Sequence, residues 1–488
     1  MFARASSSLY NLSPHPYEIL ERQPPARRFR VLDVRRLFSR ISVSPMAHVS
    51  PFRALRYDPA RVDLSKVVTQ PYDKITPEMQ ERYYAASPHN LVRIILGKRE
   101  AADGAGENTY TRAAAYFNDW RRQGIFLHEA QPSIYDYVQD FTVPGESKEL
   151  RRRGFIALGQ LEDYADNVVF RHEQTLAKPK ADRLDLLRAT RAHFGQLFML
   201  YSDPAGEIDG LLTASAAAPE IDARDEYGVR HRVAKISDPA LVDLVRSKMR
   251  DKQLIIADGH HRYETALNYR NERRSTADTA PPTSKHGFSS EVFPYEMVMM
   301  TFVNMESPGL LILPTHRVVH GLASFSPDEF RRRAKQYFSV EEVDASVDAL
   351  RATGILREAG HVGTALLAVT ADRVFLLDTP QAVGSNFFSG LSLRQQSLDV
   401  VQLHKCLLEG VLGISEEAIR NQQNISYVRD AEDAMARVRA GGANVAFLMN
   451  PVRMRQVRDI AFAGEVLPQK STDFYPKLLS GLTIYALE

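Results

Sequence analysis

Residues 258–262, with the sequence DGHHR, place one acid, one glycine and three side chains that can carry positive charge in a row. Arginine matches phosphate oxygens with two parallel N–H donors, and glycine lets another group come close to the backbone. The pattern predicts an anion site, most economically a site for a phosphate. The alternative is structural, with the arginine paired to a local acid such as Glu264 and one histidine packed in the core. The candidate residues are Asp258, Gly259, His260, His261 and Arg262.

Two adjacent histidines also raise the question of a metal ion. Neighbours in sequence point in different directions, and the HExxH pattern of zinc enzymes is absent from the sequence. We therefore expect no metal ion bound through both His260 and His261. The G-x-x-x-x-G-K-[ST] and G-x-G-x-x-G signatures of common nucleotide-binding folds are absent as well.

A second polar block, RHEQTLAKPKADR at residues 171–183, gathers charged side chains of both signs. Cations around a phosphoryl group, with a carboxylate that orients an attacking hydroxyl, are the parts that phosphoryl transfer needs. We expect Glu173 or His172 to act as a general base and the cations to contact phosphate. A solvated loop is the alternative. The block contains His172, Glu173, Lys178, Lys180, Asp182 and Arg183.

Three further segments carry polar residues next to expected turns or strand ends. Asp73 in PYDKI follows an X-Pro turn and is either part of that turn or a base or Mg²⁺ ligand. PTHR offers His316 and Arg317 as a second basic pair after a strand-like run. QKSTDFYPK can fold back around an anion or act as a structural clasp. Its candidates are Lys470, Ser471, Thr472 and Lys477.

Strands and helices must bring these residues together. The apolar run LIIA (254–257) predicts a buried strand before the DGHHR turn, and the segment after the turn predicts a helix. Elsewhere, helical and strand-like segments alternate with several hairpins, such as the one expected in ALLAVTADRVFLLD (365–378). We therefore predict a mixed α/β fold of the α+β class rather than a regular doubly wound sheet.

Three local patterns give more specific expectations. Thr76 is expected to cap a helix that begins at Pro77. NLVRIIL (90–96) alternates and is rich in branched residues, which favours a strand. KPK (178–180) indicates a turn, after which Asp182 can cap a helix.

The composition limits the classes of protein to consider. The chain has 488 residues, of which 44% are hydrophobic and 25% charged, as expected for a globular protein with a large core. A net charge of +2 gives no basic excess for a general nucleic-acid binder. No apolar run reaches the roughly 18 residues of a membrane-spanning helix. The single cysteine, Cys406, excludes a disulfide framework and fits a cytoplasmic location.

The first residues differ from the rest of the chain. Residues 1–45 contain eight arginines but only three acidic residues, in a pattern typical of a basic amphipathic helix. We interpret them as an extension upstream of a start at Met46, with a targeting or membrane-surface segment as the alternative. We predict a core domain at residues 46–320 and a C-terminal α/β domain at residues 321–488.

ADGHHRYETA resembles the phosphate-binding segment of the ParB and sulfiredoxin superfamily, which includes chromosome-partitioning nucleotidases, sulfiredoxins and free-serine kinases. The chain resembles more closely a bacterial and archaeal family of unknown function that is similar to that superfamily. The resemblance implies a ParB/sulfiredoxin-like nucleotide-binding core with large additions. The shared blocks are QPYDKITPE, NLVRIIL, HEQTLAKPKADRLDLLRATR, IADGHHRYETAL, LPTHRVV and LPQKSTDFYPKLLSGL, which together extend from about residue 50 to residue 488.

The chain departs from this superfamily at two points. His260 stands where the catalytic cysteine of sulfiredoxin is expected, which argues against sulfinic-acid reduction. No helix-turn-helix pattern follows the core, and with the balanced net charge this argues against a role in DNA partitioning.

Three functions fit these patterns. We favour a nucleotide-dependent phosphotransferase that acts on a small hydroxyl metabolite, similar to the free-serine kinases, with ATP or ADP and Mg²⁺ as cofactors. The alternatives are a nucleotide-binding switch protein with little turnover and a phosphate-ester hydrolase. The expected partners are a small-molecule substrate and a nucleotide, without nucleic acid or membrane, in a monomer or a homodimer. The catalytic candidates are Glu173, Asp73, His172 and Asp258, and the cofactor-binding candidates are Gly259, His260, His261, Arg262, Lys180, Arg183, His316 and Arg317.

Overall fold

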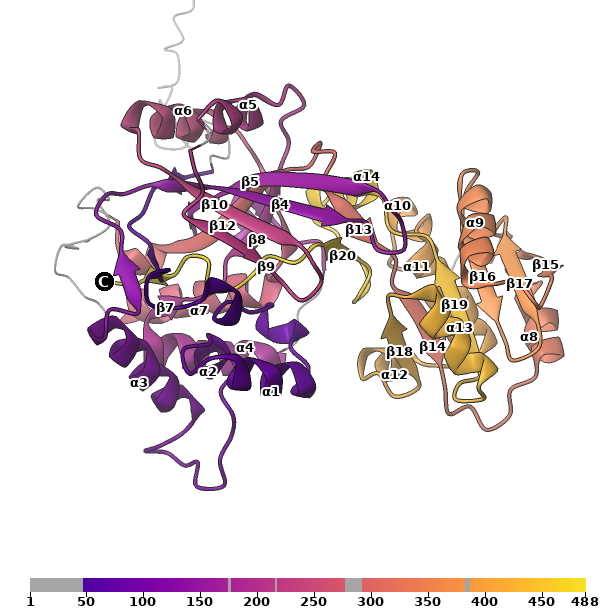
Figure 1. The fold of residues 1–488 in the computed structure, drawn as a ribbon. Helices are drawn as coiled ribbons and strands as arrows, with labels where there is room; N and C mark the ends of the chain where they lie inside the picture. Colours follow the sequence, from indigo (N-terminus) through magenta and orange to yellow (C-terminus); the bar gives the residue numbers. More distant parts are fainter. Residues whose placement is uncertain (1–46, 174–176, 216, 277–291, 382–386) are drawn as a thin grey trace, which may run out of the picture. The chain divides into compact units, whose positions relative to one another are not determined.

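The computed structural model describes residues 47–173, 177–215, 217–276, 292–381 and 387–488. The basic segment expected within residues 1–45 lies outside these ranges. Helices and strands alternate along the chain and build two main sheets, so the predicted α+β class is confirmed (Figure 1). The proposed division at residue 320 stays a prediction. None of the helices in the described ranges combines the length and the apolar character that crossing a bilayer requires.

Nine strands form the larger sheet: β1 (Val49–Ser50), β4 (Ile134–Thr142), β5 (Glu149–Gln160), β6 (Val169–Phe170), β8 (Leu197–Tyr201), β9 (Ile221–Arg224), β10 (Arg230–Ile236), β11 (Leu254–Asp258) and β12 (Met297–Asn304). Their order is β6-β11-β8-β12-β5-β4-β10-β9, with β1 paired to β5. The sheet is mixed, because β12 runs parallel to β8 and antiparallel to β5. All eight residues of β12 are buried, as expected for a central strand covered on both faces.

Helices cover both sides of this sheet, with α5 and α6 on one side and α1 to α4 on the other (Figure 1). Helix α4 packs against α3 and α7, which places residues 177–183 of the second polar block beside the helix that follows the DGHHR turn. The helices are α1 (Pro77–Ala86), α2 (Val92–Ile95), α3 (Thr109–Arg122), α4 (Ala177–Thr190), α5 (Glu207–Ala214), α6 (Pro239–Met249) and α7 (His260–Ser275). Short 3₁₀ turns lie at η2 (Leu64–Lys66), η3 (Tyr72–Lys74), η4 (Tyr164–Asp166) and η5 (Pro294–Glu296).

The second sheet is antiparallel throughout and has six strands: β14 (His316–Val319), β15 (Ser339–Val343), β16 (Ala365–Val369), β17 (Val374–Asp378), β18 (Ile425–Val428) and β19 (Val445–Met449). Their order is β15-β17-β16-β19-β14-β18, and the hairpin predicted at residues 365–378 is β16 and β17. Alternate residues of β16 belong to two hydrophobic clusters, Leu366 and Ala368 to one and Leu367 and Val369 to the other. Both faces of the sheet are therefore buried.

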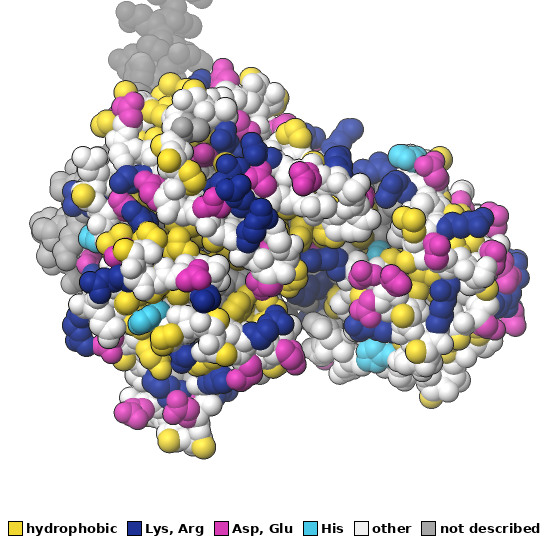
Figure 2. Space-filling view, viewed as in Figure 1, with side chains coloured by type: hydrophobic (Ala, Val, Ile, Leu, Met, Phe, Trp, Pro, Cys, Tyr) yellow, Lys and Arg dark blue, Asp and Glu magenta, His cyan; other side chains and the backbone are white. Residues whose placement is uncertain are grey.

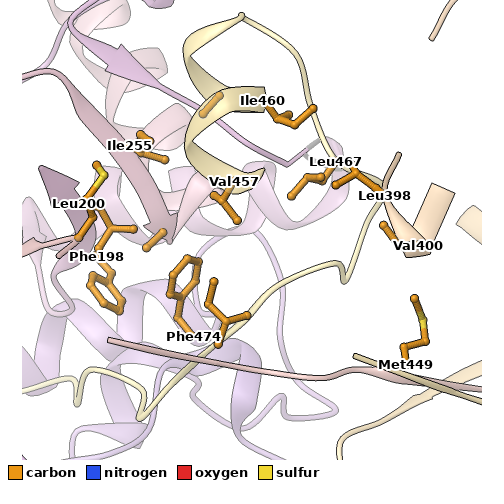
Figure 3. Packing of buried hydrophobic residues seen from close by; sticks show 14 of the residues in the cluster. Phe198, Leu200, Ile255, Leu398, Val400, Met449, Val457, Ile460, Leu467 and Phe474 are labelled. Carbon is orange, nitrogen blue, oxygen red and sulfur yellow. The ribbon is translucent and has the colours of Figure 1, made fainter. Parts of the chain in front are cut away.

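Helices that accompany the second sheet are α8 (Pro327–Ala334), α9 (Ala349–Gly360), α10 (Leu393–Gln396), α11 (Asp399–Gln402), the π-helix η6 (Leu403–Val411), α12 (Glu416–Arg420), α13 (Ala431–Arg439) and α14 (Met454–Phe462). Helices α9 and α13 share one hydrophobic cluster with the strands, whereas α8 and η6 share the other. This second cluster continues into the larger sheet through Val457, Leu467 and Phe474, which lie between Leu398 and Ile255 (Figure 3).

The last residues of the described chain return to the first part of the fold. Strand β20 (Asp473–Tyr475) pairs with β13 (Leu311–Leu313), and β21 (Tyr485–Ala486) pairs with β7 (Ala192–His193). Isolated bridges join Leu467 to Glu173, Ser480 to Thr69 and Ile484 to Leu55. A two-stranded antiparallel sheet of β2 (Leu55–Tyr57) and β3 (Phe126–His128) completes the fold. Residues on both sides of the QKSTDFYPK segment thus pair with early segments of the chain, while β20 within it pairs with β13.

The strand predicted at NLVRIIL is wrong, because residues 92–95 form helix α2. Asn90 accepts a hydrogen bond from the Val92 N–H at 2.9 Å and so starts the turn. Val92, Ile94 and Ile95 are all buried. The branched residues therefore reflect burial on several sides, which a short apolar run cannot distinguish from a strand.

The turn predicted at KPK is also wrong, because α4 already begins at Ala177. Asp182 lies inside this helix and does not cap it. Its carboxylate accepts hydrogen bonds from Tyr110 Oη at 2.9 Å and Arg183 Nε at 2.8 Å. Pro179 lies in the first turn, where a proline costs no intrahelical hydrogen bond.

The cap predicted at Thr76 is confirmed, since its hydroxyl accepts from the Met79 N–H at 3.2 Å.

Candidate phosphate-binding site

The DGHHR segment forms the strand-to-helix turn that its sequence predicts. Strand β11 ends at Asp258, and α7 begins at His260. Gly259 between them has a φ of +98°, which an L side chain rarely adopts. A Cβ atom there would lie 2.9 Å from Leu197 Cδ2 and 3.1 Å from Arg262 Cζ. The turn therefore requires glycine both for its backbone angle and for the close approach of Arg262.

Asp258 is the negative centre of the turn. Its carboxylate lies 2.8 Å from Arg262 Nη2 and 3.7 Å from Lys477 Nζ. Burial alone would raise the pKa of Asp258, but the charges of Lys477, Arg262 and Lys74 outweigh burial and hold the pKa below its ordinary value. The carboxylate is therefore ionised at neutral pH.

Lys477 links Asp258 to a second buried carboxylate. Its Nζ lies 3.0 Å from Asp473 Oδ1, and the lysine side chain is only 9% exposed. Asp473 also accepts a hydrogen bond from Arg429 Nε at 2.6 Å. Burial opposes the charge on Asp473, yet Lys477 and Arg429 lower its pKa to about 2. Asp258 and Asp473 thus form one ionised network with Arg262, Lys477 and Arg429.

This network lies at one side of a cavity of about 530 Å³, which we call the basic cavity. Its walls come from residues 70–74, 225–227, 422–429 and 470–477, segments that are far apart in the sequence. Lys and Arg side chains gather in a hollow of the surface close to β20 and β18 (Figure 2). The charged residues that line the basic cavity are Lys74, Arg429, Lys470, Lys477, Asp225 and Asp473.

Lys74 and Lys477 hold two like charges near each other in this cavity. The charge of Lys477 is the largest cause of a lowered pKa at Lys74, and burial lowers that pKa further. The carboxylates of Asp73, Asp258 and Asp473 compensate part of this repulsion, and Asp258 and Asp473 raise the pKa of Lys477. The pKa of Lys74 nevertheless stays below its ordinary value, so a further anion near Lys74 would favour its charged form.

His172 does not line the basic cavity but holds a residue that does. Its Nδ1 lies 2.7 Å from the carbonyl oxygen of Ile256, which can only accept, so Nδ1 carries the proton. Its Nε2 then accepts from the hydroxyl of Thr472 at 2.8 Å. Burial lowers the pKa of His172 to about 4, so the ring is neutral at pH 7. Both ring nitrogens are occupied, and the residue fixes Thr472, which lines the basic cavity.

Glu173 lies beside the same segment. Its Oε1 accepts a hydrogen bond from the Lys470 N–H at 2.9 Å. Burial raises the pKa of Glu173 above its ordinary value. The carbonyl oxygen of Lys470 accepts from Arg317 Nη2 at 3.1 Å, and Lys470 has a φ of +58°. Glu173 and Arg317 therefore hold the backbone on both sides of Lys470, whose side chain is exposed in the cavity.

Two of the predicted cations face a smaller cavity of about 70 Å³ next to the turn. Arg262 donates to the carbonyl oxygen of Gln196 and to Asp258. Arg183 donates to the Ile95 carbonyl oxygen at 2.6 Å and lies 4.1 Å above the centre of the Tyr72 ring. Both guanidinium groups are thus partly used in holding the fold.

The remaining candidates of the polar blocks lie around α7. Lys180 pairs with Glu264 at 2.8 Å. His260 is buried, accepts from the His172 N–H at 3.4 Å, and has a pKa lowered well below its ordinary value by burial. His261 is half-buried, and burial lowers its pKa as well. The side chain of Lys178 lies outside the described residues.

The second basic pair, His316 and Arg317, does not line the basic cavity but lies next to residues that do. His316 is buried, and its Nδ1 accepts from the Met449 N–H at 3.1 Å. Burial lowers the pKa of His316 to about 4 and that of Arg317 to about 10. Their neighbour Thr315 lines the cavity. The pair therefore positions the wall and the Lys470 backbone.

Sequence reasoning missed four charged residues of the basic cavity, which are Lys74, Asp225, Arg429 and Asp473. Lys74 follows Asp73 in the PYDKI block, where only the acid was chosen, as a base or Mg²⁺ ligand. Asp473 lies inside QKSTDFYPK and was passed over between the cations. Arg429 follows β18 in a segment without a recognisable pattern, and nothing in the sequence indicates it.

Within the described ranges, no group of three or more His, Cys, Asp or Glu side chains is arranged to hold a metal ion. The ADGHHR, PYDKI, RHEQ, PTHR and QKSTDFYPK blocks nevertheless meet around the basic cavity. The arrangement can bind a polyanion through its cations, beside the carboxylates of Asp225 and Asp473.

Comparisons with known proteins give a family and several distant structures. The profile of the family described as "Protein of unknown function (DUF1015)" matches residues 49–401. No curated protein matches the chain in a sequence comparison. A conserved hypothetical protein from Pyrococcus furiosus is 12% identical with a TM-score of 0.33, over 67% of this chain and 94% of that chain.

Two further solved structures are similarly distant. A free serine kinase in complex with AMP is 12% identical with a TM-score of 0.34, over 68% of this chain and 91% of that chain. SbnI with a C-terminal truncation, from Staphylococcus aureus, is 9% identical with a TM-score of 0.31, over 68% of this chain and 87% of that chain. These TM-scores are below 0.5, so the argument for function rests on the residues of the cavity.

Proposed function

The chain belongs to the DUF1015 family, and we propose that it binds the phosphates of a nucleotide in the basic cavity and transfers a phosphoryl group to a small hydroxyl compound. The observation that carries this proposal is the crowding of Lys74 against Lys477, beside Lys470 and Arg429, in a cavity of about 530 Å³. Small-molecule sites range from roughly 300 to 1,000 Å³, so this volume suits a nucleotide.

The cations would share the work of phosphate binding. Lys74 and Lys470 offer their ammonium groups to the cavity, whereas Lys477 and Arg429 are anchored by Asp473 and act from fixed positions. Fixed charges need no rearrangement as negative charge moves during phosphoryl transfer. The N-terminal turn of α7 adds its partial positive charge on the Asp258 side of the network.

Glu173 is the candidate general base. Its pKa is raised by burial, as a base that works near neutral pH requires, and its position is fixed by the Lys470 N–H. In the proposed step, the acceptor hydroxyl oxygen forms a bond to the terminal phosphorus as the bond from that phosphorus to the bridging oxygen breaks. The hydroxyl proton passes to Glu173, and the leaving diphosphate keeps the electron pair.

Asp73 is the candidate ligand for Mg²⁺. It is exposed in η3, directly before Lys74. Mg²⁺ usually keeps several waters and is held by one or two carboxylates together with substrate phosphates. A bound ion would supply charge neutralisation at the phosphate oxygens. Asp258 would keep Arg262 and Lys477 in place, and His172 would keep Thr472 in place, so both act as positioning residues.

Ligand binding tests the first half of the proposal. We expect ATP or ADP with Mg²⁺ to raise the melting temperature of the protein, since a ligand at 100 times its Kd stabilises by about 2.7 kcal/mol. Lys470→Ala and Lys74→Ala should each weaken this binding at least tenfold. Lys335→Ala, an exposed lysine at the end of α8, is the matched control and should change nothing. Binding that is equal in all four proteins would refute the assignment of the cavity.

Turnover tests the second half. With free serine as the first acceptor, followed by other small hydroxyl compounds, we expect transfer of phosphate from ATP to be detectable by ³¹P NMR. Glu173→Gln and Asp73→Asn should lower turnover by two orders of magnitude or more while nucleotide binding stays within about threefold. If both variants keep full activity, the base and the metal ligand lie elsewhere. Binding without turnover for any acceptor would favour the switch-protein alternative.

A further inference from the structure

Tyr227 is one of the few large hydrophobic side chains in the described ranges that are mostly exposed, at 56%. It lies in the turn between β9 and β10 and lines the basic cavity together with the cations. An aromatic ring left in water gains nothing for folding, and isolated cases need no explanation. Here, however, the ring stands at the wall of a cavity that gathers positive charge.

The turn that carries Tyr227 is fixed by Asp225. One carboxylate oxygen of Asp225 accepts from the backbone N–H groups of Tyr227 at 2.9 Å and Val229 at 3.0 Å. The other oxygen accepts from Gln70 Nε2 at 3.0 Å and lies 3.3 Å from His231 Nε2. The exposed ring is therefore presented by a turn that is tied to the segment before Lys74. Such preorganisation lowers the entropic cost of binding a ligand.

Other residues of the cavity lining also offer polar and aromatic groups. Arg429 lies over the ring of Tyr475 at 5.4 Å and pairs with Asp473. Tyr427 lines the same wall. The exposed Tyr227 ring and the Arg429 guanidinium thus both line the cavity that a flat ring would enter. Nucleobases stack on aromatic side chains, and each such contact contributes about 1–3 kcal/mol.

We propose that Tyr227 is the stacking partner of a nucleobase whose phosphates reach Lys74, Lys470 and Lys477, so that the ligand class is a nucleoside di- or triphosphate. This inference rests on the proposed phosphate site and adds the base to it. Purines, with the larger ring face, should bind more tightly than pyrimidines. Bare polyphosphates and sugar phosphates should bind through the cations alone.

Calorimetry on the full chain separates the two contributions. The ligands are ATP and inorganic triphosphate, each with Mg²⁺, and the proteins are wild type, Tyr227→Ala, Tyr227→Phe and Leu393→Ala. We expect Tyr227→Ala to weaken ATP binding by about tenfold to a hundredfold and to leave triphosphate binding unchanged. Tyr227→Phe keeps the ring and should bind ATP like the wild type. Leu393, which is 82% exposed and does not line the cavity, is the control for loss of a surface hydrophobic group.

The outcomes distinguish this inference from the proposed function. If Tyr227→Ala binds ATP as tightly as wild type while triphosphate also binds, the base lies elsewhere and the inference fails alone. If Tyr227→Ala loses ATP and triphosphate equally, the residue supports the turn rather than the base, and the inference fails. If neither ligand binds the wild type, the phosphate site is absent and both proposals fall together.

Fluorescence gives an independent readout. The chain has one tryptophan, Trp120, which is buried. Tyr227→Trp in a Trp120→Phe background places the only indole at the cavity. Stacking predicts that ATP quenches this indole and that triphosphate does not. Equal quenching by both ligands would contradict a base contact.

Discussion

At the scale of single residues, the buried Lys477 joins the carboxylates of Asp258 and Asp473. Removing one member of a buried ionised network leaves the other charges uncompensated, which costs about 3–5 kcal/mol. We expect Lys477→Met to lower the free energy of unfolding by about this amount, measured by urea denaturation. Lys470→Met removes an exposed lysine from the same segment and should change the free energy of unfolding by less than about 0.5 kcal/mol. Equal effects would show that the Lys477 network does not stabilise the fold.

Lys74 gives the anion site a dependence on pH. Its pKa lies below the ordinary value of 10.5, chiefly because of the charge of Lys477. Binding of an anion requires the protonated form of Lys74. The affinity should therefore reach its full value below this lowered pKa and fall as pH rises through it. Calorimetry with triphosphate between pH 8 and about pH 10 checks the slope. Lys74→Arg keeps its charge over this range, so its curve should be flatter. A wild-type curve as flat as that of the variant would rule out Lys74.

At the scale of elements, the β11–α7 turn depends on one glycine. Gly259→Ala forces an L side chain into a φ of +98° and pushes its Cβ towards Leu197 and Arg262. We expect a loss of about 1–3 kcal/mol in the free energy of unfolding, with weaker anion binding because Arg262 must move. Gly354→Ala is the matched control, since its Cβ would enter open space in α9 and should stabilise by about 0.5–1 kcal/mol. Differential scanning calorimetry compares the two variants. A Gly259→Ala protein as stable as wild type would contradict the strain argument.

The elements also mark where sequence reasoning succeeds. A strand, a glycine turn and a helix follow from periodicity and backbone rules, so β11, Gly259 and α7 were predictable. Helix α2 was not, because its four residues, VRII, are too few to show a helical period. The basic cavity was predictable only in part. Its charged blocks are visible in the sequence, but their meeting depends on long-range pairing such as β13 with β20, which no local pattern encodes.

At the scale of the whole molecule, buried histidines make stability depend on pH. Burial lowers the pKa of His172, His193 and His316 to about 4 and that of His404 to about 3. The unfolded chain takes up these protons near the ordinary pKa of 6.5. The stability that the neutral rings contribute is therefore complete above pH 6.5 and is lost as pH falls towards 4, by roughly 3 kcal/mol for a fully buried ring.

Several buried carboxyl groups act in the opposite direction. Burial raises the pKa of Asp136 and Asp399 to about 6 and also raises the pKa of Glu162, Glu173 and Asp209, so their contribution is lost as pH rises through these raised values. Burial also lowers the pKa of His128, His231, His260 and His261, so the histidines outnumber these carboxyl groups. We expect the free energy of unfolding, measured with urea at several pH values, to fall between pH 6.5 and 4.5. His316→Asn should reduce this slope, and a free energy that stays constant or rises towards pH 4.5 would contradict the prediction.

Because residues 467–477 pair with earlier parts of the fold, the cavity can be completed only late in synthesis. Lys74 leaves the ribosome early, whereas Lys470 and Lys477, which share its cavity, are added some four hundred residues later. At ~5–20 residues per second, the interval is roughly 20–80 s. During synthesis the early strands must therefore stay soluble without their last partner. A ligand that needs both halves of the cavity would recognise only chains whose translation has passed this segment.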